Sequence, residues 1–370
     1  MDTSQLINVA VLFGGRSSEH DVSLGTGCMI CNSLDRSRYR VKPVLISRLG
    51  KWLLPRRFLE DGDILHPDDY ASIPTGGAPV QLRRIGACDV TRGPERLLED
   101  ANPIDVFFIG LHGPFGEDGA MQGLLEIIDV AYTGCDVQAS AHALDKVLSK
   151  HTYVALGITT PNFAVISQGS PHCRNAARLV EGKIGYPCVV KPATQGSSYG
   201  VTICQSEKEL PGALEESFRF HRDALVEEFI GGIELSCGVL EDPATGKLQP
   251  LPLIEIVPKE SVFFDYHAKY TPGATDEICP ARISPERTQR IQDISLAACD
   301  GLGISGFSRV DFILRDEIPY LLEINTIPGM TTTSLLPKEA MAAGIAFPEM
   351  LDRIIQSGVR AHRERQARRH

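Results

Sequence analysis

The stretch SRVDFILRDEIPYLLEIN, residues 308–325, contains two runs in which apolar and polar side chains largely alternate. Such alternation is typical of β-strands with one buried face. The runs 308–314 and 320–325 therefore predict two strands, and the segment 315–319 between them is short enough for a hairpin loop. A register centred on Glu317 sets the two strands side by side.

The polar face of this predicted hairpin gathers groups suited to a metal ion. Arg309 and Asp311 share one face of the first strand, and the register places Asp311 opposite Glu323. Asn325 lies on the same face as Glu323. Carboxylate and amide oxygens are the ligands that Mg²⁺ prefers, usually shared with nucleotide phosphates. We predict a magnesium site here, because a surface ion pair of Arg309 with the acids would not explain the apolar opposite face of Val310, Phe312 and Ile324.

The first third of the chain predicts a parallel sheet covered by helices on both faces. Continuous apolar strands alternate with apolar-periodic helices, which is the pattern of such sheets. The expected strands are 7–13, 41–46 and 104–109, and the expected helices are 22–34 and 119–129. Residues 49–102 are rich in Pro, Gly and charge, so no element is predicted there.

After Thr133-Gly134 the pattern changes to a small α+β unit and then to a second sheet. The small unit is predicted as helices 139–156 and 207–220 with strands 163–166, 186–192, 200–204 and 224–230. The second sheet adds strands 233–240 and 251–257 to the hairpin, with a helix at 285–299. The expected fold class is therefore α/β and α+β, with units at 1–134, 135–227 and 228–370.

The composition is that of a globular protein with an acidic balance. The 370 residues carry a net charge of −10, whereas a nucleic-acid partner calls for clustered cations, so we expect none. The basic run 360–370 is interpreted as a solvated helix end. No apolar stretch approaches the ~20 residues that span a bilayer. The ten scattered cysteines are typical of reduced thiols, so a cytoplasmic location away from membranes is expected.

A Gly- and Ser-rich turn follows a predicted strand that ends in Lys191, within VVKPATQGSSYG at residues 189–200. Small residues let backbone N–H groups approach phosphate oxygens, and the lysine supplies positive charge. Taken alone, such a turn is more often a plain hairpin. Lys146, on the predicted helix 139–156, is either a solvated lysine or a second phosphate contact.

Two acids, Glu227 and Glu234, stand at the ends of an extended apolar stretch that contains Phe229 and Ile230. Exposed backbone between two acids is suited to adenine and ribose. The alternative is that two edge strands simply end in charged residues.

Two Gly-containing loops follow strands of the predicted parallel sheet, where α/β proteins bind ligands. The first, Phe13–His20, lacks the third Gly of the dinucleotide fingerprint, so a dehydrogenase is disfavoured. The second, Leu111–Gly119, contains His112, which taken alone would more often be structural. The aromatic and cationic segment 263–273 ends in turn residues and predicts a lid.

Taken together and in this order, these segments resemble the D-alanine–D-alanine ligases of the ATP-grasp superfamily. The matching motifs are GGRSSEHDVSL, LHGPFGEDGAMQG, ALDKVLSK, VVKPATQGSSYGV, VEEFIGGIE, FFDYHAKY, GFSRVDF and LLEINTIPGMTTTSLLP. The resemblance extends from about residue 9 to about residue 355 and is poor between 49 and 102. It implies a three-domain ATP-grasp architecture in which an N-terminal parallel-sheet domain precedes two ATP-grasp subdomains.

The resemblance also implies roles for individual residues. It implies ATP binding by Lys146, Lys191, Ser198, Glu227, Glu228, Ile230, Glu234, Phe263 and Lys269. It implies two Mg²⁺ or Mn²⁺ ions on Asp311, Glu323 and Asn325. It places the first D-alanine near Glu19, Ser197, Tyr270 and His112, and the second near Ser334 and Leu335. It implies that Arg309 and the backbone N–H of Gly329 stabilise the oxyanion.

The implied reaction is ATP-dependent ligation of two D-alanines through an acyl phosphate, for peptidoglycan precursor synthesis, by a homodimer. The attacking amine must lose a proton, and the sequence does not identify the group that accepts it. Tyr270 favours D-alanine over D-lactate as the second substrate, whereas D-serine is harder to exclude. Two further alternatives are another ATP-grasp ligase and a non-catalytic nucleotide-binding regulator. The regulator is disfavoured because a binding module would not need Arg309, Asp311, Glu323 and Asn325 together.

Overall fold

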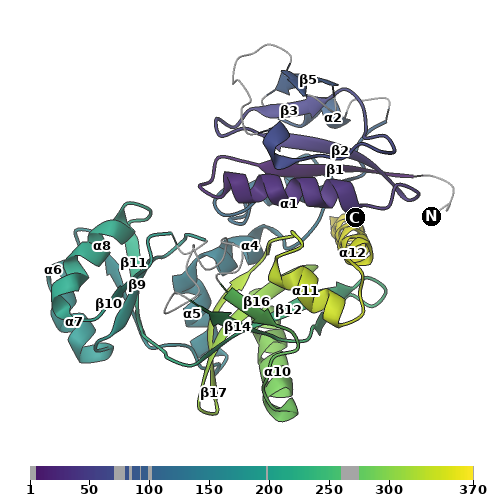
Figure 1. The fold of residues 1–370 in the computed structure, drawn as a ribbon. Helices are drawn as coiled ribbons and strands as arrows, with labels where there is room; N and C mark the ends of the chain where they lie inside the picture. The colour runs from purple at the N-terminus through teal and green to yellow at the C-terminus, as the bar shows by residue number, and fades with distance from the viewer. Residues whose placement is uncertain are drawn as a thin grey trace.

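This computed structural model describes residues 6–70, 80–82, 86–91, 93–98, 102–196, 199–259 and 275–369. Within these residues the strands form sheets of seven, four and six strands, and Figure 1 shows the three sheets as separate bodies with helices around them. In this view the first sheet lies at the top, the second at the left and the third at the lower right.

The first sheet, in the order β4-β5-β3-β2-β1-β6-β7, lies at the top of Figure 1. Its strands are β1 (Ile7–Gly14), β2 (Tyr39–Ile46), β3 (Trp52–Pro55), β4 (Val80–Leu82), β5 (Gly86–Thr91), β6 (Val106–Ile109) and β7 (Ala131–Tyr132). Its helical segments are α1 (His20–Ser33), η1 (Pro67–Asp69), α2 (Glu95–Leu98) and α3 (Ala120–Ile127). The pairs β2–β1 and β1–β6 are parallel as predicted, and the short β7, which was not predicted, pairs with β6 in parallel as well. Strands β3, β4 and β5 extend the sheet in antiparallel fashion.

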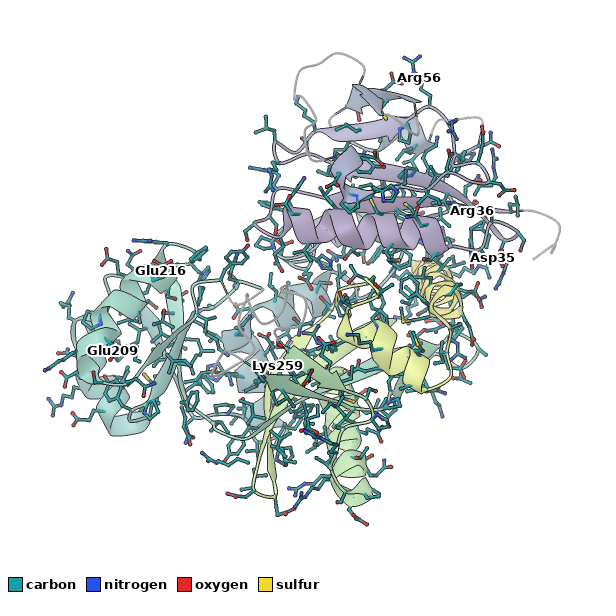
Figure 2. The ribbon with its side chains drawn as sticks, in the orientation of Figure 1. Asp35, Arg36, Arg56, Glu209, Glu216 and Lys259 are labelled. Atoms are coloured by element: carbon teal, nitrogen blue, oxygen red, sulfur yellow. The ribbon has the colours of Figure 1, made fainter. Side chains whose placement is uncertain are left out.

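The second sheet is antiparallel, in the order β10-β9-β11-β8. Its elements are β8 (Phe163–Ser167), α6 (Pro171–Arg174), α7 (Ala176–Lys183), β9 (Cys188–Pro192), β10 (Thr202–Cys204), η2 (Glu207–Glu209), α8 (Leu210–Phe218) and β11 (Asp223–Glu228). Residues of α7 and α8 share one apolar core with the strands. Figure 2 shows Glu209 and Glu216 on the outer side of this unit, away from the other two sheets.

The third sheet has the order β15-β14-β12-β16-β17, with β13 paired to β12. Its strands are β12 (Ile233–Asp242), β13 (Lys247–Pro250), β14 (Ile254–Pro258), β15 (Thr275–Ile278), β16 (Phe307–Arg315) and β17 (Ile318–Asn325). The associated helices are α4 (Val137–Leu144), α5 (Lys146–Ala155), α10 (Pro285–Leu302), α11 (Leu335–Ala342) and α12 (Phe347–Arg369). Side chains of α4, α5 and α10 share the core of this sheet.

The helix predicted at 139–156 is two helices that meet at Asp145. Asp145 has extended backbone dihedrals, φ −78° and ψ 98°, and its side chain accepts the N–H groups of Val147 (2.9 Å) and Leu148 (3.1 Å). An aspartate in this conformation is a strong N-cap, and it starts a new helix. The break places Lys146 at the first position of α5.

The predicted hairpin is present, with a tighter turn than the register centred on Glu317 implies. Arg315 pairs with Ile318, so the turn is Asp316-Glu317, and Asp316 has a positive φ of 56°. A bulge between Asp311 and Phe312 then shifts the register by one residue, and Asp311 faces Glu323 as predicted.

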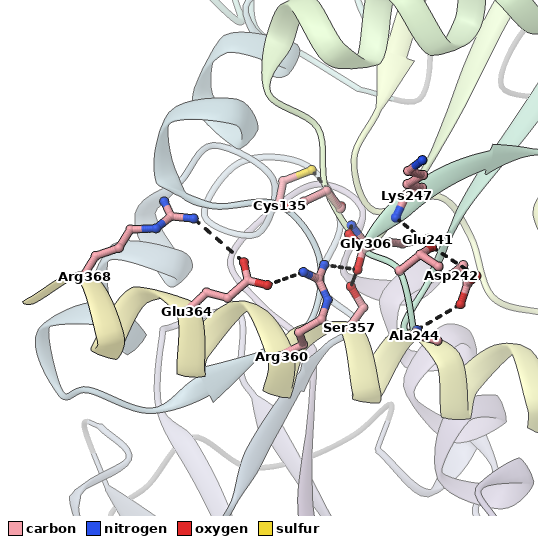
Figure 3. Close-up of polar contacts among 12 residues, drawn as sticks. Cys135, Glu241, Asp242, Ala244, Lys247, Gly306, Ser357, Arg360, Glu364 and Arg368 are labelled. Atoms are coloured by element: carbon pink, nitrogen blue, oxygen red, sulfur yellow. Dashed lines mark hydrogen bonds and ion pairs between the residues drawn. The ribbon is translucent and has the colours of Figure 1, made fainter.

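The basic run at the end of the chain is not simply solvated, because it belongs to α12, which packs beside β7 and β12. Arg360 reaches the buried carboxylate of Glu241 and also bonds Glu364 (Figure 3). Ser357 donates to the same Glu241 carboxylate, and the guanidinium of Arg365 lies 4.7 Å from the ring centre of Tyr132. The terminal helix thus connects the third sheet to the first.

No helix of the described segments combines the length and the apolar character needed to cross a membrane. The cysteines in these segments form no disulfide, in keeping with the predicted reduced thiols.

Candidate active site

The β16–β17 hairpin is a common wall of two adjoining cavities. The first cavity lies between the second and third sheets, and among its lining residues are Lys146, Lys191, Glu227, Glu228, Ile230, Glu234, Asp311 and Glu323. The second lies between the first and third sheets, and among its lining residues are Glu19, His112, Glu117, Arg309, Asn325, Gly329, Ser334 and Leu335. Gly196 lines both cavities, so they meet beside the loop that follows Lys191.

The polar face of the hairpin is tightly hydrogen-bonded. Arg309 donates two bonds to the Asp311 carboxylate, of 2.8 and 2.7 Å, and the side-chain amide of Asn325 donates to Asp311 at 2.9 Å. Glu323 pairs with Lys146, whose Nζ lies 3.1 Å from its carboxylate. Although burial alone would lower the pKa of Arg309, the adjacent Asp311 raises it, so the guanidinium stays charged. The predicted convergence of these side chains is confirmed.

The donor set of the hairpin fits a cation that brings further ligands of its own. The described residues contain no group of three or more His, Cys, Asp and Glu side chains that could hold a metal. Asp311, Glu323 and Asn325 supply two carboxylates and one amide oxygen, and Asp311 already accepts from Arg309. Mg²⁺ is commonly bound by one or two carboxylates together with nucleotide phosphates, which matches such a partial set.

The cationic end of the first cavity is built around the carboxylate of Glu227. Lys191 and Lys150 both pair with this carboxylate, and the side chains of Lys150 and Glu227 are 0% and 3% exposed. Lys150 also donates to Thr160 at 2.6 Å, and Thr160 donates to the Leu321 carbonyl at 2.8 Å. Lys146 donates to the Gln195 carbonyl at 2.8 Å. The three lysines are therefore fixed in place, two of them on α5 and one on β9.

If this cavity holds ATP, as the resemblance of the sequence implies, Lys150→Met is expected to weaken ATP binding by roughly tenfold, the scale of one charge-assisted hydrogen bond. Without Lys150, Lys191 is the cationic partner of the Glu227 carboxylate that remains among the described residues, so Glu227 holds Lys191 more firmly away from a phosphate. Titration calorimetry with ATP measures the effect. The matched control is Lys183→Met, at an exposed position of α7. An unchanged ATP affinity with a lowered melting temperature would show that Lys150 serves stability alone.

Glu19 belongs to the wall of the second cavity that the first sheet and its loops form, and its side chain is enclosed there, since the residue is only 5% exposed. A Cβ atom at Gly113 would lie 2.2 Å from Oε2 of Glu19, and one at Gly196 would lie 2.7 Å from the same atom. Gly113 also has a φ of +67°. Both positions therefore need glycine for the Glu19 carboxylate to fit between the two loops.

The opposite end of the second cavity is the loop that leads into α11. Ser334 Oγ accepts the Thr331 N–H at 3.0 Å and lies 2.8 Å from Thr331 Oγ1. A Cβ atom at Gly329 would lie 2.7 Å from Ser334 Oγ, so these two predicted residues are direct neighbours. Met330 and Leu336 are fully buried and are not among the lining residues.

Three buried charged residues beside the cavities were missed by the sequence analysis. They are Lys150, Glu117 and Glu339. Burial raises the pKa of Glu339 to about 8, and its carboxylate lies over Gly238, the strand partner of Arg309. Glu117 stood within a quoted motif, so an acid in a loop after a strand was the available signal. The predicted residues Ser197, Ser198, Phe263, Lys269 and Tyr270 lie outside the described residues.

The comparisons with known proteins agree with this arrangement. The family model described as D-ala D-ala ligase N-terminus matches residues 8–135, and that described as D-ala D-ala ligase C-terminus matches residues 153–356. A D-alanine–D-alanine ligase of Syntrophotalea carbinolica is 40% identical over 347 residues, covering 94% of each chain.

Solved structures show the same likeness over the whole chain. The VanG D-Ala:D-Ser ligase of Enterococcus faecalis has a TM-score of 0.78 at 31% identity, covering 95% of this chain and 99% of that one. A D-alanine–D-alanine ligase of Bacillus anthracis complexed with ATP has a TM-score of 0.72 at 29% identity, covering 97% and 100%. With both family models matched and relatives aligned from end to end, this chain belongs to the D-alanine–D-alanine ligase family.

Proposed function

We propose that this chain joins two D-alanine molecules into D-alanyl-D-alanine, with conversion of ATP to ADP and phosphate. The observation that carries the proposal is the shared wall between the two cavities. Asp311 and Glu323 line the cavity suited to a nucleotide, and Arg309 and Asn325 line the cavity suited to amino acids. A carboxylate in the second cavity is then next to a γ-phosphate in the first, as formation of an acyl phosphate requires.

On the nucleotide side, Lys146 and Lys191 bind the phosphates, and Asp311, Glu323 and Asn325 hold two Mg²⁺ or Mn²⁺ ions. When bound, these ions neutralise charge on the phosphate oxygens. Adenine lies against Glu227, Glu228 and Ile230, and the ribose is bound by Glu234, all of which line this cavity. Ser198, Phe263 and Lys269 complete the ATP site in this proposal.

On the amino-acid side, Glu19 accepts the ammonium group of the first D-alanine, together with Ser197 and Tyr270, and His112 lies beside it. Ser334 and Leu335 bound the place of the second D-alanine. Arg309 and the Gly329 N–H stabilise the negative oxygen that develops when the second amine attacks the acyl phosphate. Preorganised donors in a site that excludes water act most strongly on such a charge.

D-Serine is the second candidate for the second substrate, because hydroxyl groups line this end of the cavity. Thr331, Thr333 and Ser334 are lining residues, whereas the apolar Met330 and Leu336 are not. The hydroxyls are already paired with each other, since Thr331 Oγ1 lies 3.1 Å from Thr333 Oγ1 and 2.8 Å from Ser334 Oγ. A paired set has less need of a substrate hydroxyl, which favours the methyl group of D-alanine.

A competition assay with D-alanine, D-serine and D-lactate in equal amounts is expected to yield mainly D-alanyl-D-alanine. Discrimination against D-serine is expected to be modest, ~10²-fold at most, because a pocket rejects one added hydroxyl weakly. ATP-dependent phosphate release, measured with each compound alone and in pairs, serves as the control. An excess of D-alanyl-D-serine or of the ester product would contradict the assigned second substrate and leave the ATP chemistry in place.

The proposed setting is a cytoplasmic homodimer that supplies peptidoglycan precursor synthesis. This part of the proposal rests on membership of the family. The absence of a membrane-crossing helix in the described segments is compatible with it.

A further inference from the structure

The backbone of Ile327, just after β17, contacts two side chains of the first-sheet unit through its N–H and its carbonyl oxygen. Nδ1 of His112 is 3.0 Å from the Ile327 carbonyl oxygen, and the Ile327 N–H donates to Oε1 of Glu117 at 3.1 Å. His112 and Glu117 are 5% and 8% exposed, so water competes little for either bond. Both bonds join parts of the chain that lie more than 200 residues apart.

The contacts of His112 fix its protonation. A carbonyl oxygen only accepts, so Nδ1 must carry a proton toward Ile327. Nε2 lies 2.8 Å from the Thr26 hydroxyl, which can donate to it. Burial lowers the pKa of His112 to about 4, so the ring is neutral. With its one proton on Nδ1, Nε2 carries no proton and can accept from Thr26. Both ring nitrogens are therefore used within the protein.

Glu117 is fixed just as firmly. Its second oxygen, Oε2, accepts the Gly113 N–H at 2.7 Å, which anchors it to the loop that also carries His112. Gln122 supports the same loop by donating to the Gly116 carbonyl at 2.8 Å. Burial, and the nearby Glu19 carboxylate, raise the pKa of Glu117 to about 8. The first-sheet unit therefore presents a prebuilt acceptor and donor pair to the two consecutive peptide groups that flank the Cα atom of Ile327.

The Ile327 carbonyl belongs to the peptide bond with Pro328, so the hydrogen bond from His112 orients that peptide, while Glu117 holds the peptide before it. Pro328 has a fixed φ, so the direction of the chain into Gly329 depends on how these two peptides are held. The remainder of the loop is closed on itself, because Ser334 N donates to the Thr331 carbonyl at 3.0 Å and Ser334 Oγ accepts from Thr331 N. Residues 331–334 are thus held by their own hydrogen bonds, and His112 and Glu117 hold the backbone where the loop begins, at Ile327.

We propose that His112 and Glu117 are positioning residues that clamp the backbone of Ile327, one at its carbonyl and one at its N–H, and so set the place of the Gly329 N–H and of the second-substrate end of the cavity. The inference that this placement governs ligation rests on the proposed function, whereas the clamp itself does not. In this role His112 acts through the backbone of the 327–334 loop, and no hydrogen bond from its ring to the substrate is required.

The first test compares His112→Asn with His112→Gln. The amide nitrogen of asparagine reaches the position of Nδ1 and keeps the bond to Ile327, whereas that of glutamine reaches the position of Nε2 and loses it. We expect His112→Asn, which keeps the bond to Ile327, to retain clearly more turnover than His112→Gln. We expect His112→Gln to lose roughly 10- to 100-fold, the range found when a group that orients active-site ligands is removed. The reverse order would show that Nε2 meets the substrate directly and would overturn the proposal.

The second test needs no substrate. Hydrogen exchange measured by mass spectrometry on the ligand-free full chain is expected to speed up in peptides that cover 326–334 in His112→Gln and Glu117→Gln, and to stay unchanged in β8–β11. Unchanged exchange at 326–334 in both variants would overturn the clamp. A wild-type chain that shows the clamp but forms no dipeptide would instead contradict the proposed function.

A double-mutant cycle separates one shared action from two independent ones. Because His112 and Glu117 hold the backbone of the same residue, His112→Gln combined with Glu117→Gln is expected to cost little more in turnover than the worse single variant. The KM for the second amino acid is expected to rise in each variant, with ATP affinity unchanged. Losses that multiply in full would contradict a joint clamp.

Discussion

Glu323→Gln and Asp311→Asn are each expected to leave a folded protein whose turnover is lowered roughly 100-fold or more, as loss of a metal-binding carboxylate would do. The two acids face each other across the β16–β17 pair and line the cavity proposed for ATP. An amide preserves the size of each side chain but carries no negative charge to attract a divalent ion. The loss should therefore appear as a weaker response of turnover to Mg²⁺.

The two variants differ in what else they remove. Asp311→Asn also takes the charged partner from the buried guanidinium of Arg309, so a lower melting temperature is expected. Glu323 pairs with Lys146 and its side chain is 24% exposed, so Glu323→Gln tests metal binding with less effect on stability. The matched control is Glu317→Gln, in the turn of the same hairpin, whose ion pair with Arg287 is exposed.

The measurements are Mn²⁺ binding to the ATP-loaded protein and turnover as a function of Mg²⁺ concentration. Weaker Mn²⁺ binding in Glu323→Gln, with Glu317→Gln unchanged, is the expected result. Near-normal turnover of Glu323→Gln at limiting Mg²⁺ would show that the hairpin acids do not hold the ion.

The parts of the fold that were predicted are those with a local signal. Strand β1 and the β16–β17 hairpin follow from continuous or alternating apolar residues, which reflect burial on two faces or one. The bulge beside Phe312 had no such signal, because it depends on how the two strands twist against each other. The prediction that Asp311 faces Glu323 is nevertheless correct, because the one-residue shift at the bulge compensates for the one-residue shift caused by the shorter turn.

The parts that were missed depend on distant contacts. Strands β3 and β5 lie in the weakly periodic region 49–102 and are held by strand pairing. Strand β3 pairs with β2 on one side and with β5 on the other. The domain boundaries at 134 and 228 stay predictions. Packing crosses both of them, because α4 and α5 share a core with the third sheet, and α12 shares a core with the first. Lys150 illustrates the same limit at the site. A lysine on a helix is ordinarily solvated, and only the fold brings Glu227 to it.

Arg309→Met is expected to lower turnover by about 10²-fold or more while ATP still binds, as loss of an oxyanion donor does. The Arg309 side chain is 13% exposed, lines the amino-acid cavity, and is held by two hydrogen bonds from its guanidinium to Asp311. A donor fixed in this way before the reaction stabilises developing charge without having to reorganise. Nucleotide binding should survive, because Arg309 is not among the residues that line the other cavity.

Arg309→Lys serves as the matched variant, because lysine keeps the charge but cannot form the paired hydrogen bonds of a guanidinium with a carboxylate. If turnover depends on how Asp311 orients the Arg309 guanidinium, Arg309→Lys should recover only a small part of the turnover lost in Arg309→Met. The ATP affinity of Arg309→Lys is expected to equal that of wild type. Single-turnover measurements of ADP and dipeptide formation, together with calorimetric titration of ATP, separate these effects. A variant with weakened ATP binding and unchanged turnover at saturating ATP would show that Arg309 binds nucleotide and takes no part in the chemical step.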